Sequence, residues 1–201
     1  MNKTILWLLL FFSVLLWSAI HPKEYFTWFL EVVPALIGLV LMAWTYRSFP
    51  LTPLLYILIL IHSMVLMVGG HYTYAEVPLF DTIRDMFEME RNNYDKVGHF
   101  MQGFVPAILA REILIRKEVV RGRGWLNYIV LSIVLAFSAF YELIEWAVAQ
   151  SSGEGAEAFL GTQGYVWDTQ SDMAWALFGG VMALLLLSRY HDHQLREVGY
   201  V

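Results

Sequence analysis

The sequence predicts an all-α, polytopic membrane helix bundle that forms one integral membrane domain over residues 1–201. Hydrophobic residues make up 58% of the chain and charged residues only 15%, and the mean hydropathy is +0.54. The apolar residues are gathered in stretches long enough to cross about 30 Å of hydrocarbon. A lone span in lipid must satisfy its own backbone hydrogen bonds, so we expect each stretch to be a helix.

Six transmembrane helices are expected in chain order, at about residues 4–20, 26–46, 52–70, 95–115, 125–148 and 172–190. The first follows Lys3 and resembles a secretory signal, but Trp17 and Ile20 spoil a small-residue cleavage site, so we interpret it as an uncleaved anchor. Tryptophans near the ends of the other spans, such as Trp44 and Trp125, support the boundaries because their rings favour the depth of the lipid headgroups.

The distribution of basic residues predicts the orientation of this bundle. Nine of the 13 Lys and Arg residues would lie on the side of the N-terminus: Lys3, Arg47, Arg111, Arg116, Lys117, Arg121, Arg123, Arg189 and Arg196. Loops rich in Lys and Arg remain in the cytoplasm. We therefore expect a multi-pass protein of the bacterial inner (cytoplasmic) membrane, with both termini inside (N-in/C-in) and three loops outside.

Two of the expected outer segments have a composition of their own. Residues 78–92 carry Phe80, Ile83, Met86 and Phe87 at spacings of three and four, interleaved with charged residues, which is typical of an amphipathic helix at the interface. A plain solvated connection is the alternative. Residues 151–164 are rich in glycine and small polar residues, which predicts a flexible outer loop.

Imidazoles and carboxylates gather at one predicted depth, toward the outer ends of four helices. The residues are His71, Asp95, His99, Glu142, Glu145, Asp168 and Asp172. Three pairs of them are spaced by three or four positions, so each pair shares a helix face. A charged group in the centre of a membrane helix costs about 2.5 to 3.5 kcal/mol on insertion scales, and such groups usually pair, line a cavity or have a function.

Most of these residues have a simpler interpretation when taken singly. Acids at helix starts interact favourably with the macrodipole, and Thr169 with Asp172 matches a capping box. His71 is also compatible with an ordinary interfacial histidine. Capping does not explain Glu142 and Glu145, because both are expected near a helix C-terminus, where the dipole disfavours acids.

The chemistry that these side chains favour is metal-assisted. The chain has no cysteine, so ligands must be His and carboxylate, which suit zinc or manganese and, less well, magnesium. We expect the ligands to come from His71, His99, Glu145, Asp168 and Asp172. Glu142 would be the general base on a metal-bound water, and Asp95 would orient His99 or be a ligand itself.

The expected substrate is an envelope lipid or a lipid-linked molecule, because a site at that depth faces the outer leaflet. Lys96 or Arg91 would bind an anionic headgroup. We expect contact with membrane lipids, no nucleic-acid partner and no organic cofactor. Two alternatives stay open: proton- or cation-coupled transport, which the mainly apolar inner halves of the spans disfavour, and a structural protein whose polar cluster only joins helices.

Four motifs, "HYTYAEVPLFD", "YDKVGHF", "ELIEW" and "WDTQSDMAWALFGG", resemble the YjdF family of bacterial inner-membrane proteins. The second half is also similar to the wider VanZ-like group, in whose motifs Asp95, Lys96, His99, Phe100, Glu142, Asp168 and Gly179 have counterparts. Glu145 and Asp172 depart from that pattern, which has Gln and Asn there. Each departure adds a negative charge, which favours a cation site. The resemblance implies an envelope setting and names no reaction.

Overall fold

The computed structural model describes residues 3–152 and 162–199, and these residues contain helices and no strand. The helices are α1 (Lys3–Ala19), α2 (Tyr25–Thr45), α3 (Pro53–Tyr72), α4 (Pro78–Met86), α5 (Tyr94–Arg116), α6 (Arg123–Ser152) and α8 (Asp168–Glu197). Among them, α2, α3, α6 and α8 are long and apolar enough to cross a membrane. The prediction of an all-α membrane helix bundle is thus confirmed. The count of six spans remains a prediction.

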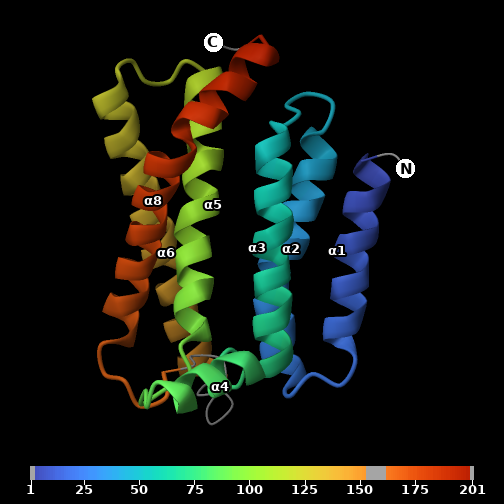
Figure 1. Cartoon of the computed structure of the whole chain (residues 1–201), viewed down its shortest axis with the longest axis vertical. Helices are drawn as coiled ribbons and strands as arrows, with labels where there is room; N and C mark the ends of the chain where they lie inside the picture. The colour runs from blue at the N-terminus through green and yellow to red at the C-terminus, as the bar shows by residue number, and fades with distance from the viewer. Residues whose placement is uncertain (1–2, 153–161, 200–201) are drawn as a thin grey trace.

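The long helices run side by side and alternate in direction, so the described ends of the chain lie at the same end of the bundle (Figure 1). The short α4 lies across the opposite end, which we call the α4 end (Figure 1). The alternation agrees with the predicted topology, in which both termini are inside and the α4 end is outside.

The tightest helix pair is α5 and α8, and α5 also packs against α3 and α6. Two glycines permit the close approach. A Cβ atom on Gly103 would overlap the carbonyl group of Ala176, and one on Gly179 would overlap the carbonyl of Phe100. Because the backbones touch in this way, side chains at the α4 end of α5 meet those at the start of α8.

Three helices differ from their predicted ranges by four residues or more at one end at least. α8 begins at Asp168 and continues to Glu197, because its last turns bury His191 and Leu195. α6 extends at both ends of the predicted range. The predicted interfacial helix ends at Met86, where Glu88 takes a φ of 50°, a left-handed conformation that stops a helix. Residues 153–161 of the predicted outer loop lie outside the described residues.

Apolar residues form the interior and also cover the exterior of the bundle. One buried cluster, including Ile108, Val130 and Val134, joins α3, α5, α6 and α8. Large apolar side chains such as Leu16 and Trp44 are exposed to 66% and 79% on the outer surface. Such a surface is unfavourable in water and favourable in lipid, as expected of a membrane protein.

Candidate functional site

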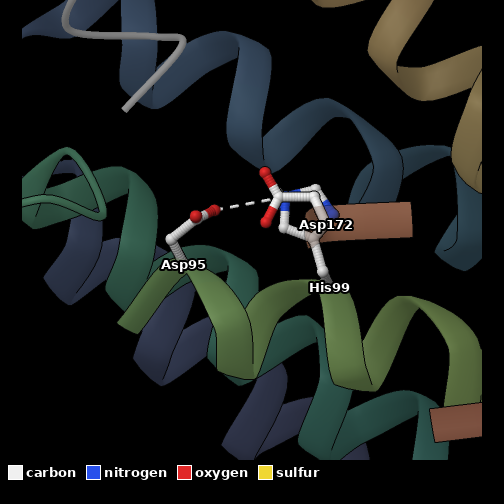
Figure 2. A group of neighbouring side chains, drawn as sticks. All are labelled: Asp95, His99 and Asp172. Carbon is white, nitrogen blue, oxygen red and sulfur yellow. Dashed lines mark ion pairs between the residues drawn. The ribbon is translucent and has the colours of Figure 1, made fainter. Parts of the chain in front are cut away.

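Three buried side chains at the α4 end, Asp95 and His99 from α5 and Asp172 from α8, point toward one another (Figure 2). His99 Nε2 lies 3.2 Å from Asp95 Oδ1 and 3.6 Å from Asp172 Oδ2. Asp95 and His99 share a face because they are four residues apart on one helix. Asp172 joins them from α8, which Gly103 and Gly179 allow to lie close to α5. The three side chains form the candidate site.

The spacing of these atoms fits a metal ion. One ligand atom from each residue can be chosen so that all lie within 4.8 Å of one another. Two ligands of a tetrahedral zinc, each about 2.0 to 2.2 Å from the ion, lie about 3.3 to 3.6 Å apart. The distances of 3.2 and 3.6 Å from His99 Nε2 to the two carboxylate oxygens are close to that span.

The ring of His99 is oriented by a neighbour on its own helix. Its Nδ1 lies 3.0 Å from Gln102 Oε1. An amide oxygen only accepts hydrogen bonds, so Nδ1 carries a hydrogen. Histidine ligands in metal sites typically donate their second ring nitrogen to an oxygen in this way. Nε2 faces two carboxylates, which also only accept, so Nε2 would have to lose its hydrogen to ligate an ion. The side chain of His99 therefore presents Nε2 toward the two aspartates.

Two cations bind the carboxylate oxygens that face away from His99. Lys96 Nζ lies 2.5 Å from Asp172 Oδ1 and 3.1 Å from Asp95 Oδ2. Arg91 contacts the same oxygen of Asp95 at 3.2 Å and holds Asp168 Oδ1 at 2.5 Å. Asp95 Oδ1 and Asp172 Oδ2 are left facing the imidazole. The cations fix both aspartates without using the atoms that would ligate an ion.

A second group of acids lies beside the ring of His99. Glu142 Oε1 is 3.9 Å from His99 Nδ1, and within the described residues this buried oxygen has no hydrogen-bond partner. Glu145 is equally buried and interacts electrostatically with Glu142 and His99. Glu142 and Glu145 on α6 therefore border the site. No Lys or Arg among the described residues pairs with Glu142 Oε1.

Glu31 on α2 is a further buried acid, which the sequence analysis missed. It is 5% exposed, its Oε2 accepts a hydrogen bond of 3.4 Å from Tyr141, and it interacts electrostatically with His99 and Asp95. The sequence did hold a signal, because Glu31 is the only charged residue inside the predicted span 26–46.

The described part of this site holds more acids than cations. Six carboxyl groups are buried there, those of Glu31, Asp95, Glu142, Glu145, Asp168 and Asp172, whereas Arg91 and Lys96 supply two positive charges. Full ionisation would leave an excess of four negative charges, beside a neutral His99. Buried charges without partners are costly, so the cluster must take up protons or cations.

The remaining predicted residues lie as follows. Asp168 is held by Arg91 and by Lys96, the latter at 3.2 Å. His71 contacts α1, since its Nδ1 lies 3.0 Å from the carbonyl oxygen of Ser18 and its ring lies against Trp17. The N-cap of α8 is Trp167, with no side-chain capping bond, so the capping box considered for Thr169 and Asp172 does not form.

A second buried polar cluster lies at the opposite end of α5 and α8. Glu112 and His191 are 0% exposed, and His191 Nε2 lies 2.9 Å from Glu112 Oε2. Arg116 and Thr52 also bind Glu112, at 2.8 and 2.7 Å, and Arg111 lies 2.8 Å from His191 Nδ1. The expectation of mainly apolar inner halves was therefore incomplete, because this end of the bundle contains a hydrogen-bonded network.

Comparison with known proteins places these features in a family. A family model described as "Predicted membrane protein (DUF2238)" matches residues 3–193. The chain is similar to "Inner membrane protein YjdF" of Escherichia coli (strain K12), with 50% identity over 188 residues, which are 94% of this chain and 90% of that protein. No solved structure matches the chain. The similarity to the VanZ-like group remains a prediction.

Proposed function

We propose, from the premise that this chain belongs to the DUF2238 family of inner-membrane proteins, that it is a metal-dependent enzyme. A divalent ion, zinc or manganese, binds between α5 and α8 at the predicted periplasmic end of the bundle. The reaction is hydrolysis or group transfer on an envelope lipid or a lipid-linked substrate.

The observation that supports this proposal is the convergence of Asp95, His99 and Asp172. Asp95 Oδ1, His99 Nε2 and Asp172 Oδ2 are the proposed ligands, at the spacing described above. Three protein ligands leave a position for water or substrate, which distinguishes a catalytic zinc site from a closed structural one. Asp95 is thus proposed as a ligand, one of the two roles that its sequence position allows.

Glu142 is the proposed general base. Its Oε1 is buried beside His99 and has no hydrogen-bond partner among the described residues, so it is free to accept a proton. A bound divalent ion lowers the pKa of its water ligand toward neutrality, and a nearby carboxylate completes the deprotonation. Lys96 then has a positioning role, because it fixes Asp95 and Asp172 through their second oxygens.

Metal analysis of the purified protein tests this proposal. We expect stoichiometric zinc or manganese in the wild type, its loss in His99→Ala, and its retention in Glu142→Gln, because the base is not a ligand. His193→Ala is the matched control, since His193 lies on α8 with a side chain 63% exposed. A wild-type protein without stoichiometric metal, after purification in metal-supplemented buffer, would overturn the proposal.

Cation- or proton-coupled transport is the second candidate. The network around Glu112 and His191 favours it, because it adds buried polar groups at the other end of the same two helices. Proteoliposomes test it directly: transport predicts a proton or metal flux that Glu112→Gln abolishes, whereas the enzyme predicts no flux in either protein.

A further inference from the structure

An apolar groove opens on the surface beside the candidate site. It has a volume of about 590 Å³, and α4, α5 and the start of α8 contribute its walls. Its lining is largely apolar and includes Phe80, Ile83, Val97, Phe100, Tyr165 and Trp175. Phe80 and Ile83 lie on α4, Tyr165 precedes α8, and the others lie in the first turns of α5 and α8. In the predicted topology the groove is thus at the depth where acyl chains meet headgroups.

The groove continues along α8 toward the middle of the bundle. A shallower pocket is lined by Ser171, Ala174, Trp175 and Phe178, which share one helix face because they occupy positions i, i+3, i+4 and i+7. Seven residues of helix span about 10 Å. Trp175 and Phe178 are 40% and 48% exposed. The apolar surface is therefore elongated, as a hydrocarbon chain requires.

The polar end of the groove leads to the candidate site. Lys96 and Arg91 belong to the lining, and the same two side chains hold the aspartates, Lys96 binding Asp172 and Asp95. The ring of Tyr165 lies over both cations, at 5.5 Å from Arg91 and 5.8 Å from Lys96. A headgroup at this end would contact Lys96 or Arg91, which themselves contact the proposed ligands Asp95 and Asp172.

The local charge decides which headgroup fits. Asp95, Asp168 and Asp172 carry three negative charges against the two positive charges of Arg91 and Lys96. With Glu31, Glu142 and Glu145 neutral, this part of the site has one net negative charge without metal and repels an anion, and each of these acids that ionises adds another. A bound divalent ion offsets two negative charges and offers a phosphate an open coordination position.

We infer that the groove binds the hydrocarbon chain of a membrane lipid whose headgroup is a phosphate with a net negative charge, and that the phosphate enters the site only when the divalent metal is bound. This inference rests on the proposed function and names the substrate class of the same site. The apolar walls select a lipid over a soluble phosphate, because a free ion has nothing to bury against Phe100 and Trp175.

The test uses the full-length protein in nanodiscs with equal amounts of phosphatidic acid and phosphatidylcholine, with retained lipids measured by native mass spectrometry. We expect a preference for phosphatidic acid with Zn²⁺ or Mn²⁺ and no preference with EDTA. Trp175→Ala should lower retained phosphatidic acid about fivefold, the effect of losing one aromatic contact. Trp44→Ala is the control, since this tryptophan is 79% exposed on α2 and outside the groove.

The outcomes separate this inference from the proposal on which it depends. If the protein binds metal but shows no preference for phosphatidic acid, the inferred lipid site is overturned and the proposed metal site is not. A preference that persists in EDTA overturns the charge argument, and absence of metal overturns both. Competition by inorganic phosphate at the concentration of phosphatidic acid would identify a soluble anion as the ligand and overturn the lipid assignment.

Discussion

Replacing Asp172 with asparagine removes one proposed ligand and almost no volume. In the wild type this residue binds Lys96 at 2.5 Å and faces His99 at 3.6 Å. The variant Asp172→Asn lowers the excess of buried carboxylates from four to three, and Lys96 keeps Asp95 and Asp168 as partners. We therefore expect the metal-free variant to be at least as stable as the metal-free wild type, and to gain little stability from metal.

The size of the effect follows from mass action. A metal present at 100 times its Kd stabilises the folded state by about 2.7 kcal/mol. For a chain of 201 residues, each kcal/mol raises the melting midpoint by about 2 to 4 °C, so the wild type should gain roughly 5 to 10 °C. Mutation of a residue that only orients a ligand already weakens metal binding by about 10- to 100-fold, so we expect loss of a ligand to weaken it by about 100-fold or more. The stabilisation by metal is then less than about 0.4 kcal/mol, or roughly 1 °C.

Tryptophan fluorescence melts of the detergent-purified protein, with EDTA or with Zn²⁺, Mn²⁺ or Mg²⁺, measure these shifts. Asp85→Asn is the matched control, because Asp85 is an acid on α4 with a side chain 70% exposed. A purely structural cluster gives the opposite pattern: no shift with metal in the wild type, and a metal-free Asp172→Asn destabilised by about 3 to 5 kcal/mol because a buried pair is broken. That pattern would refute the reasoning.

Three further predictions concern the bundle around the site. Glu112→Gln should lower the free energy of unfolding by about 3 to 5 kcal/mol, because it removes the buried carboxylate that Arg116 and His191 bind, whereas exposed Glu118→Gln should change little in the same melts. Gly103→Ala should cost about 1 to 3 kcal/mol by forcing α5 from α8, and Gly38→Ala, where a Cβ meets nothing within 4 Å, should not. Burial alone would raise the pKa of Glu24, but hydrogen bonds from Thr27 and Phe26 lower it below the ordinary value. Glu24→Gln should lower the free energy of unfolding by about 0.5 to 2 kcal/mol near neutral pH. This difference between the two proteins should vanish as the pH falls through the pKa of Glu24 in the folded protein.

The sequence predicted the helices well because each span is a long apolar stretch whose ends carry aromatic or charged residues. It also predicted that Asp95 and His99 share a face, since their spacing of four residues fixes this in any α-helix. The position of Asp172 near them required one more fact, the close approach of α5 and α8. Gly103 and Gly179 permit that approach, but glycines are common in membrane helices and do not identify their partner helix.

Other features were beyond the reach of helix periodicity. His71 was grouped with the site because it ends its helix at the predicted depth, whereas in the structure it contacts Ser18, and depth alone does not say which neighbour a side chain faces. The network of Glu112 and His191 joins residues 79 positions apart. Their basic neighbours had been interpreted only as signals of orientation, because Lys and Arg near span ends have that role in any membrane protein.

The structure also bears on whether the two polar clusters cooperate. On α5, Gln102 and Arg111 are nine positions apart, which is about 13.5 Å along the helix, and buried Val105, Ala107 and Ile108 lie between them. On α8, residues 173–187 are all apolar or glycine. Polar exceptions near this level in the described residues are half-buried His62 and buried Ser63 and Ser138. His62 Nε2 and Ser138 Oγ have no hydrogen-bond partner there, and Ser63 donates only to the carbonyl oxygen of Ile59 on its own helix. A proton relay needs donors and acceptors in contact, so we expect the α4-end site to exchange ions with its own side of the membrane, which favours the proposed enzyme over the transport alternative.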